Sequence, residues 1–197
     1  MAVNVTALTM GPGEIYWGEF GATEPDPLQI ANRIPDIAAV SGEWTDLGGT
    51  NGGVTLELSL DYTELEVDQI VDIVGRRLTK REMKLNTSLA ETTLENFRIA
   101  NNGGDISGAP TDDVQTFEPK MDTSAATPEY IALIFDGVNG GTSRRRRVLA
   151  RRVLSVAGIG QEYSKDSQTL FPVEFSCHYV DTDTAPFMYI DEGLGTP

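Results

Sequence analysis

The stretch VTLELSLDY, residues 54–62, gives the clearest indication of the fold. Apolar side chains alternate there with polar or acidic ones along the whole stretch. Because successive side chains of a strand point to opposite faces, this period of two predicts a half-buried β-strand with an acidic outer face. The side chains expected to face inward are Val54, Leu56, Leu58, Leu60 and Tyr62.

The residues that follow this strand extend the β pattern. LTKREMKLNTSL (78–89) favours a second strand, with Leu78, Met83, Leu85 and Leu89 as its possible inward residues. Between the two strands lies TELEVDQIVDIVGRR (63–77), which fits a strand followed by a loop or by one arm of a hairpin.

Three further segments are predicted to be strands. GEIYWGEFG (13–21) is a short aromatic segment bounded by glycines. EYIALIFD (129–136) is followed by a glycine-rich turn and an arginine-rich stretch, which together predict a β-hairpin. In TLFPVEFSCHYVD (169–181), apolar residues again alternate, and Pro172 predicts an edge or a bulge because proline lacks the backbone donor.

One helix stands out, in ETTLENFRIANNGG (91–104). Thr92 and Glu95 have the spacing of a capping box, and Asn101 to Gly103 supply residues that tolerate a left-handed stop. A helix of two or three turns is marginal alone, so it is expected to pack on a sheet.

Together these elements predict a mainly β chain: a β-sandwich or barrel of about seven to nine strands with one short flanking α-helix. A length of 197 residues fits one domain, 1–197. The proline-rich connection at 22–43 and an arm at 182–197 are expected to be irregular.

Charge and hydropathy limit where the chain can act. The formal net charge is −15, and the first Lys or Arg is Arg33, so the positive start of a signal peptide is missing. The longest apolar run, around 131–135, is far shorter than the ~20 residues of a membrane helix. We therefore expect a soluble subunit that does not bind membranes.

Catalytic chemistry is nearly absent from the sequence. Cys177 and His178 are the only residues of their types, and as neighbours on a strand they would point to opposite faces, a poor geometry for a dyad. No spacing fits a zinc site, an EF-hand or a phosphate loop. We expect neither enzymatic activity nor a cofactor or metal site.

Several stretches, taken in order, resemble the tail tube (major tail) protein of long-tailed bacteriophages. They are GEIYWGEFGATEP, WTDLGGTNGGVTLEL, VDQIVDIV, LNTSLAETTLENFRIA and RRVLSVAGIGQEYSKDSQTLFPVEFSCHYV. The resemblance spans residues 13 to about 180 and rests on the order and spacing of these stretches. The connection at 22–40 and the tail after Thr182 carry none of it.

The resemblance implies a structural virion protein. Members of this family form hexameric rings whose inner strands join into a continuous β-barrel, and the rings stack into a hollow tube through which DNA passes into the host. The implied partners are other copies of the chain and the tail's tape-measure, terminator and distal tail proteins. The implied location is the tail tube of the virion, after assembly in the host cytoplasm. The tube protein of type VI secretion shares the plan and remains an alternative, as does a β-sandwich binding module of a virion.

A conduit for DNA must not hold phosphate groups, and only charges near the lumen matter at a Debye length of ~8 Å. We therefore hypothesise that acidic residues of the first long strand line or approach the lumen. These residues are Glu57, Asp61, Glu64 and Glu66.

The stretch GTSRRRRVLARRVL (141–154) is unusual in such an acidic chain. On a strand it would present mixed apolar and basic faces, which favours contacts between subunits, within a ring or between rings. A solvated basic face and a nucleic-acid site on a helix are the other interpretations. The proposed interface residues are Arg144, Arg145, Arg146, Arg147, Arg151 and Arg152.

Overall fold

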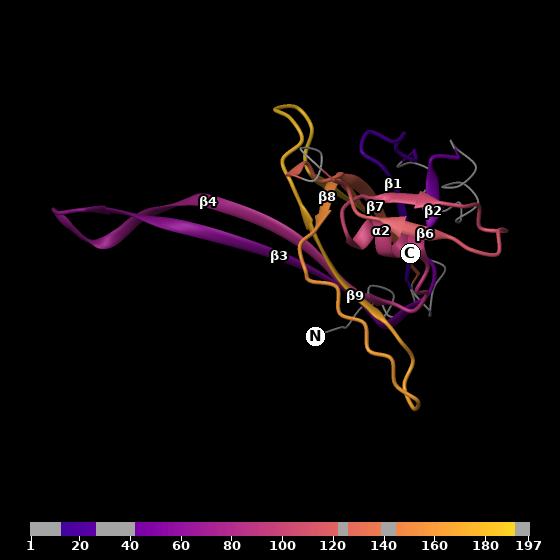
Figure 1. Cartoon of the computed structure of the whole chain (residues 1–197). Coiled ribbons are helices and arrows are strands. Elements are labelled where there is room, and N and C mark those ends of the chain that lie inside the picture. The colour runs from indigo at the N-terminus through magenta and orange to yellow at the C-terminus, as the bar shows by residue number, and fades with distance from the viewer. Residues whose placement is uncertain (1–12, 27–41, 122–125, 139–144, 192–197) are drawn as a thin grey trace, which may run out of the picture.

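The computed structural model describes residues 13–26, 42–121, 126–138 and 145–191, which form mainly β-structure (Figure 1). The strands of the principal sheet are β1 (Gly13–Glu19), β2 (Trp44–Asp46), β3 (Thr50–Val67), β4 (Ile70–Leu89), β7 (Ile131–Val138), β8 (Arg145–Ser155), β9 (Phe171–Cys177) and β10 (Phe187–Asp191). The helix α2 (Leu94–Ala100) is followed by a small separate sheet of β5 (Asp105–Ser107) and β6 (Thr116–Glu118).

The principal sheet is antiparallel throughout, in the order β2-β1-β7-β8-β9-β4-β3. One side of β8 pairs with β7, and its other side is shared by β10 and β9. β2 and β3 are the two ends of this path, so the described strands form an open sheet rather than a closed barrel. The prediction of a mainly β fold with one short helix is confirmed.

The core lies on both faces of the sheet, since consecutive residues of β1 enter different clusters. Ile15 belongs to a large cluster that also contains Leu85, Leu89 and Ile99 of the helix, whereas Tyr16 packs in a smaller one with Trp44 and Ile134. The helix therefore covers one face of the sheet. Among the described residues we find no helix long and apolar enough to cross a membrane.

The helix begins one residue later than the capping box predicts. Thr93, not Thr92, is the N-cap, and its side-chain oxygen accepts a hydrogen bond of 3.1 Å from the backbone N–H of Asn96. The predicted stop is confirmed, because Asn102 has a φ of 58° and Gly103 one of 119°.

The hairpin predicted after residue 129 is confirmed as β7 paired with β8; the turn at 139–144 lies outside the described residues. Pro172 lies where β9 pairs with β4 alone, beyond the end of its pairing with β8, which fits the prediction of a local edge. The C-terminal segment expected to be irregular contains β10, because the free side of β8 offers backbone partners from Arg146 to Ala150. Residues 27–41 of the other irregular segment lie outside the described residues.

Candidate assembly surface

The most conspicuous feature of the molecule is a two-stranded arm made by the outer parts of β3 and β4 (Figure 1). β9 pairs with β4 only between Lys84 and Leu89. From Leu58 on β3 and Met83 on β4 outward, each strand has only the other as a described partner. We call residues 58–83 the arm, and both of its edges carry backbone groups that no described strand pairs.

The arm carries most of the exposed large apolar side chains of the described chain. Ten of the seventeen lie on it, and Val71 near its tip is 104% exposed. The ten are Leu58, Leu60, Tyr62, Leu65, Val67, Ile70, Val71, Ile73, Val74 and Leu78. Clustered exposure of this kind marks an interaction surface, since monomeric proteins rarely leave contiguous apolar patches in water.

One face of the arm continues the hydrophobic core. Leu56 packs against the large core cluster, and Leu58 and Leu60 follow it at intervals of two on the same face. The alternation expected from the sequence is therefore present. The expected burial is not: Leu58 is 47% exposed and Leu60 42% exposed, because no described layer of the subunit lies over this part of β3. Leu78, also expected to face inward, is exposed for the same reason.

The two strands of the arm have opposite charge. β3 contributes carboxylates and no basic residue, whereas five basic residues stand on β4 beside Asp72 and Glu82. The basic residues are Arg76, Arg77, Lys80, Arg81 and Lys84. These basic residues are clustered in the sequence, but only the strand pairing places them opposite an acidic strand.

Only some of these charges are paired within the subunit. Glu64 accepts from Arg76 at 2.8 Å in an exposed pair. Lys80 donates to Glu82 at 2.6 Å, and this hydrogen bond raises the pKa of the ammonium and lowers that of the carboxyl. Lys84 donates to Glu174 at 2.7 Å, which raises the pKa of Lys84.

The acidic residues predicted to approach the lumen all lie on β3 and are exposed. Glu57 and Asp61 stand directly opposite Lys84 and Lys80. Glu64 is paired with Arg76, as described above, and Glu66 lies at the bulge near the tip. The face that carries Glu57 and Asp61 therefore mixes both signs of charge, and its position relative to a lumen stays a prediction.

The arginine stretch forms β8, and part of it is buried. Arg147 is 1% exposed and donates to Asp136 at 2.9 Å; Arg145 is 5% exposed and lies 3.5 Å from the same carboxylate. The hairpin register brings Asp136 of β7 directly opposite Arg147. Their guanidinium groups are enclosed within their own subunit, which argues against the predicted contact of these two arginines with a neighbouring subunit.

The other arginines of β8 also have partners in the same subunit. Arg146 pairs with Asp191 at 2.9 Å. Arg151 donates to Glu24 at 2.5 Å, and the guanidinium of Arg152 lies 3.9 Å from the centre of the Tyr130 ring. Arg144 lies outside the described residues. Paired arginines offer little free positive charge to phosphate, which weakens the nucleic-acid interpretation.

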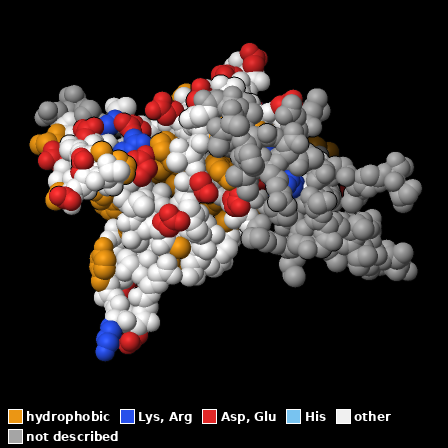
Figure 2. Space-filling view, turned by 90° about the vertical axis from the view of Figure 1, so that its right-hand side faces the viewer, with side chains coloured by type: hydrophobic (Ala, Val, Ile, Leu, Met, Phe, Trp, Pro, Cys, Tyr) orange, Lys and Arg blue, Asp and Glu red, His pale blue; other side chains and the backbone are white. Residues whose placement is uncertain are grey.

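The face of the body turned away from the arm is sparsely basic. Figure 2 shows acidic side chains scattered over it and few basic ones. Among the described residues on this face, no continuous basic patch is visible that would bind a phosphate backbone.

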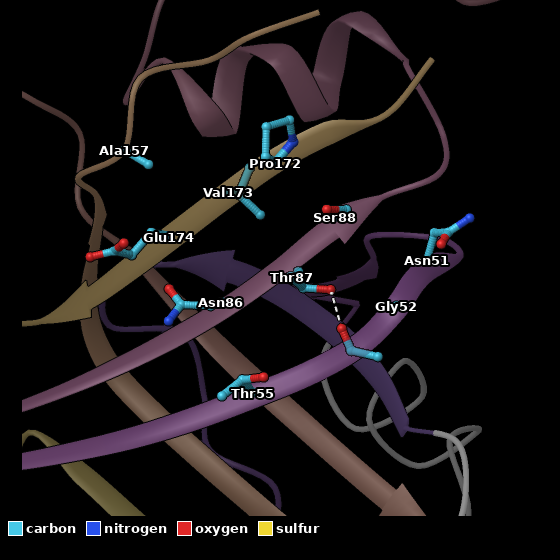
Figure 3. A pocket seen from close by; sticks show the side chains of 11 residues that line it. Asn51, Gly52, Thr55, Asn86, Thr87, Ser88, Ala157, Pro172, Val173 and Glu174 are labelled. Carbon is cyan, nitrogen blue, oxygen red and sulfur yellow. Dashed lines mark hydrogen bonds between the residues drawn. The ribbon is translucent and has the colours of Figure 1, made fainter. Parts of the chain in front are cut away.

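A hollow of about 390 Å³ lies at the root of the arm, between β3, β4 and β9 (Figure 3). Gly52 and Gly53, with φ of 83° and 82°, form a bulge there, and Thr87 donates to the carbonyl of Gly53 at 2.9 Å. Five of its eleven lining residues carry an amide or hydroxyl side chain, and the lining carboxylate of Glu174 is already engaged by Lys84. The residues that line the hollow therefore offer no combination of acid, base and nucleophile.

The only cysteine and histidine are not arranged for catalysis. Burial raises the pKa of Cys177 to about 12, so its thiolate is scarce at neutral pH. His178 packs edge-on against the Tyr130 ring, with 5.5 Å between ring centres. Within the described ranges, no group of three or more His, Cys, Asp or Glu side chains is placed to hold a metal ion.

No family model matches the chain, and no curated protein matches its sequence. Among solved structures, the chain is similar to one in the "Cryo-EM structure of the anti-feeding prophage (AFP) baseplate, 6-fold symmetrised". That match has a TM-score of 0.40 and 9% identity, and it covers 96% of this chain and 97% of the other. A TM-score this low does not establish a shared fold.

Proposed function

We propose that this chain is a structural subunit that assembles with copies of itself into rings, and that the rings stack into a hollow tube of the phage tail type. The observation that carries the proposal is the arm. A two-stranded ribbon is at best marginally stable in water, and three or more strands with a covered apolar face are needed for independent stability. The arm has two strands and an uncovered apolar face, so it lacks both requirements within one subunit.

Other copies of the chain supply what the arm lacks. Open strand edges are templates for pairing with further strands. When arms stand side by side, each edge gains a partner, and the apolar face is withdrawn from water as it is at the root of the arm. In the proposed tube, which takes its plan from the resemblance to tail tube proteins, six such arms build the inner wall and DNA passes through it.

The proposal gives the chain a structural role and no enzymatic one. Its principal partner is itself, with the tape-measure, terminator and distal tail proteins meeting the ends of the tube. In this proposal the chain belongs to the virion and assembles in the host cytoplasm.

The test is assembly of the purified protein, followed by sedimentation and negative-stain electron microscopy. Wild-type protein is expected to form rings or hollow tubes above a critical concentration. The double variant Leu58→Ser/Leu60→Ser removes two exposed side chains of the apolar face, so the subunit should remain folded. Full burial of a leucine contributes about 1.5–3 kcal/mol, and assembly can bury only the exposed half of each side chain. The critical concentration of the double variant should therefore rise about 10- to 150-fold.

The matched control is Val114→Ser, which removes an exposed apolar side chain (71%) away from the arm. It should assemble as the wild type does. Wild-type protein that stays monomeric at high concentration, or a double variant that assembles normally, would contradict the proposal.

A further inference from the structure

Several charged side chains of the arm have no ion-pair partner within the described part of the subunit, and their positions bear on how neighbouring arms are arranged. Among the described residues, three carboxylates of β3 make no ion pair, and neither do two guanidinium groups of β4. These groups are Glu57, Asp61, Glu66, Arg77 and Arg81. Apart from Asp68 and Asp72 at the tip, the unpaired negative charge of this ribbon is thus on one edge strand, and the unpaired positive charge is on the other.

From this distribution we infer that neighbouring arms lie side by side, with β4 of one copy beside β3 of the next. In this arrangement Arg77 meets Asp61 of the neighbouring copy. This inference rests on the proposed function. The opposite arrangements, β3 beside β3 or β4 beside β4, would bring like charges together along most of the contact, which is destabilising.

The direction of the chain fits this pairing. Within one arm, β3 and β4 run antiparallel. When identical arms point the same way around a ring, β4 of one copy and β3 of the next are also antiparallel. The neighbouring edge therefore repeats the strand pairing that already exists inside each arm, with no change of ladder type.

The register places the two named residues within reach. Thr63 is directly opposite Arg77 inside the arm, and Asp61 is two residues from Thr63 on the same face. When neighbouring arms stand level, Asp61 of the next copy is opposite Lys80, which Glu82 already engages, and across the bulge beside Asp61 it is diagonal to Arg77. Diagonal neighbours lie about 7–8 Å apart at the backbone, which a long arginine side chain spans.

Arg81 lies on the other face of the arm. It stands opposite Leu60, so no carboxylate faces it in its own arm. Its guanidinium lies 5.6 Å from the centre of the Phe187 ring, which holds the group near the base of the arm. Each subunit thus has a basic edge on β4 and an acidic edge on β3. The basic edge of one copy attracts the acidic edge of the next copy and repels another basic edge.

The experiment uses two single charge reversals in the full-length chain, Arg77→Glu and Asp61→Arg. Alone, each variant brings like charges together at every contact between arms. We expect each to raise the critical concentration for assembly by about tenfold, and to lose this defect as salt screens the charges. Far-UV circular dichroism of the dilute proteins should match that of the wild type, since both side chains lie on the exposed arm.

The decisive sample is an equimolar mixture of the two variants. Where β4 of the Arg77→Glu chain meets β3 of the Asp61→Arg chain, the two charges are exchanged but still opposite. At the next contact, the unchanged Arg77 meets the unchanged Asp61, so alternating copies restore every contact. The mixture should assemble at a critical concentration within about twofold of the wild type. A change acting only inside one arm would not be rescued, because each chain still carries a single reversal.

Lys165→Glu is the control for net charge, since Lys165 is an exposed cation of the 156–170 loop, outside the arm. It should assemble as the wild type does. Single reversals that assemble normally, a mixture that is not rescued, or a control as defective as Arg77→Glu would overturn this inference while the proposed function stands. Wild-type protein that never assembles would overturn both.

Discussion

Replacing Asp136 by asparagine tests how strongly the fold depends on the buried charge cluster of β7 and β8. Asp136 is 2% exposed and is the carboxylate that Arg147 and Arg145 share, at 2.9 and 3.5 Å. Asp136→Asn keeps the shape of the side chain but removes its charge, so two buried guanidinium groups lose a counterion. Breaking a buried pair in this way costs about 3–5 kcal/mol of unfolding free energy.

The structure also predicts an asymmetry between the partners. Arg147→Met fills a similar volume and leaves Asp136 with Arg145 beside it, so neither of these two charges is left without an opposite one. Its cost should be smaller than that of Asp136→Asn. The control is Glu95→Gln, which removes the partly exposed pair with Arg98, at 41% and 25% side-chain exposure, and should cost under about 1 kcal/mol.

Urea denaturation of dilute protein, followed by circular dichroism, measures all three free energies. For a chain of this length, the loss expected for Asp136→Asn corresponds to a fall in Tm of about 6–20 °C. The reasoning is refuted when Asp136→Asn costs no more than Glu95→Gln, or when Arg147→Met proves the more damaging change.

Two further predictions concern the helix and the buried titratable groups. Thr93→Ala removes the N-cap acceptor of α2 and should lower the free energy of unfolding by about 1 kcal/mol. Thr92→Ala, at the adjacent exposed position, should change it by less than about 0.5 kcal/mol. Equal losses of unfolding free energy in urea denaturation would contradict the assigned cap. Burial raises the pKa of Cys177 from 9.0 to about 12, and burial with the Glu14 hydrogen bond raises that of Tyr16 above its usual range. Above pH 9 the unfolded chain therefore releases protons that the folded chain retains, so the free energy of unfolding should fall between pH 9 and pH 12. Alkylation of native Cys177 at pH 8 should be slow, since only about one thiol in 10,000 is ionised, and should become fast on unfolding; rapid native labelling would argue against its burial.

Local patterns in the sequence were sufficient for most of the strands and for the helix stop. The alternation from Val54 to Tyr62 correctly predicts a strand and the face on which its apolar side chains stand, because the period of two follows from backbone geometry alone. The left-handed stop at Asn102 is a property of a few residues and was likewise readable. The one-residue shift of the cap arose because Thr92 and Thr93 are adjacent and chemically equivalent.

The length of β3 in the structure explains why its outer apolar side chains are not covered within one subunit. A strand of 18 residues, the length of β3, extends about 60 Å. A compact domain of 197 residues, the length of the whole chain, is only about 40 Å across. The apolar side chains between Leu65 and Val74 therefore lie farther out than one subunit can cover. Periodicity identifies which face is apolar, but it does not identify what covers that face.

What the sequence determined by itself was the local conformation: the strands, their faces, the short helix and the sparseness of catalytic groups. Tertiary structure alone decided which side chains are enclosed. Arg147 is buried and Leu60 is exposed, the reverse of what their hydropathy suggests. The physical reason is that burial depends on strands distant in sequence: the β7–β8 register provides Arg147 with Asp136, whereas no other described layer of the subunit reaches the outer half of β3.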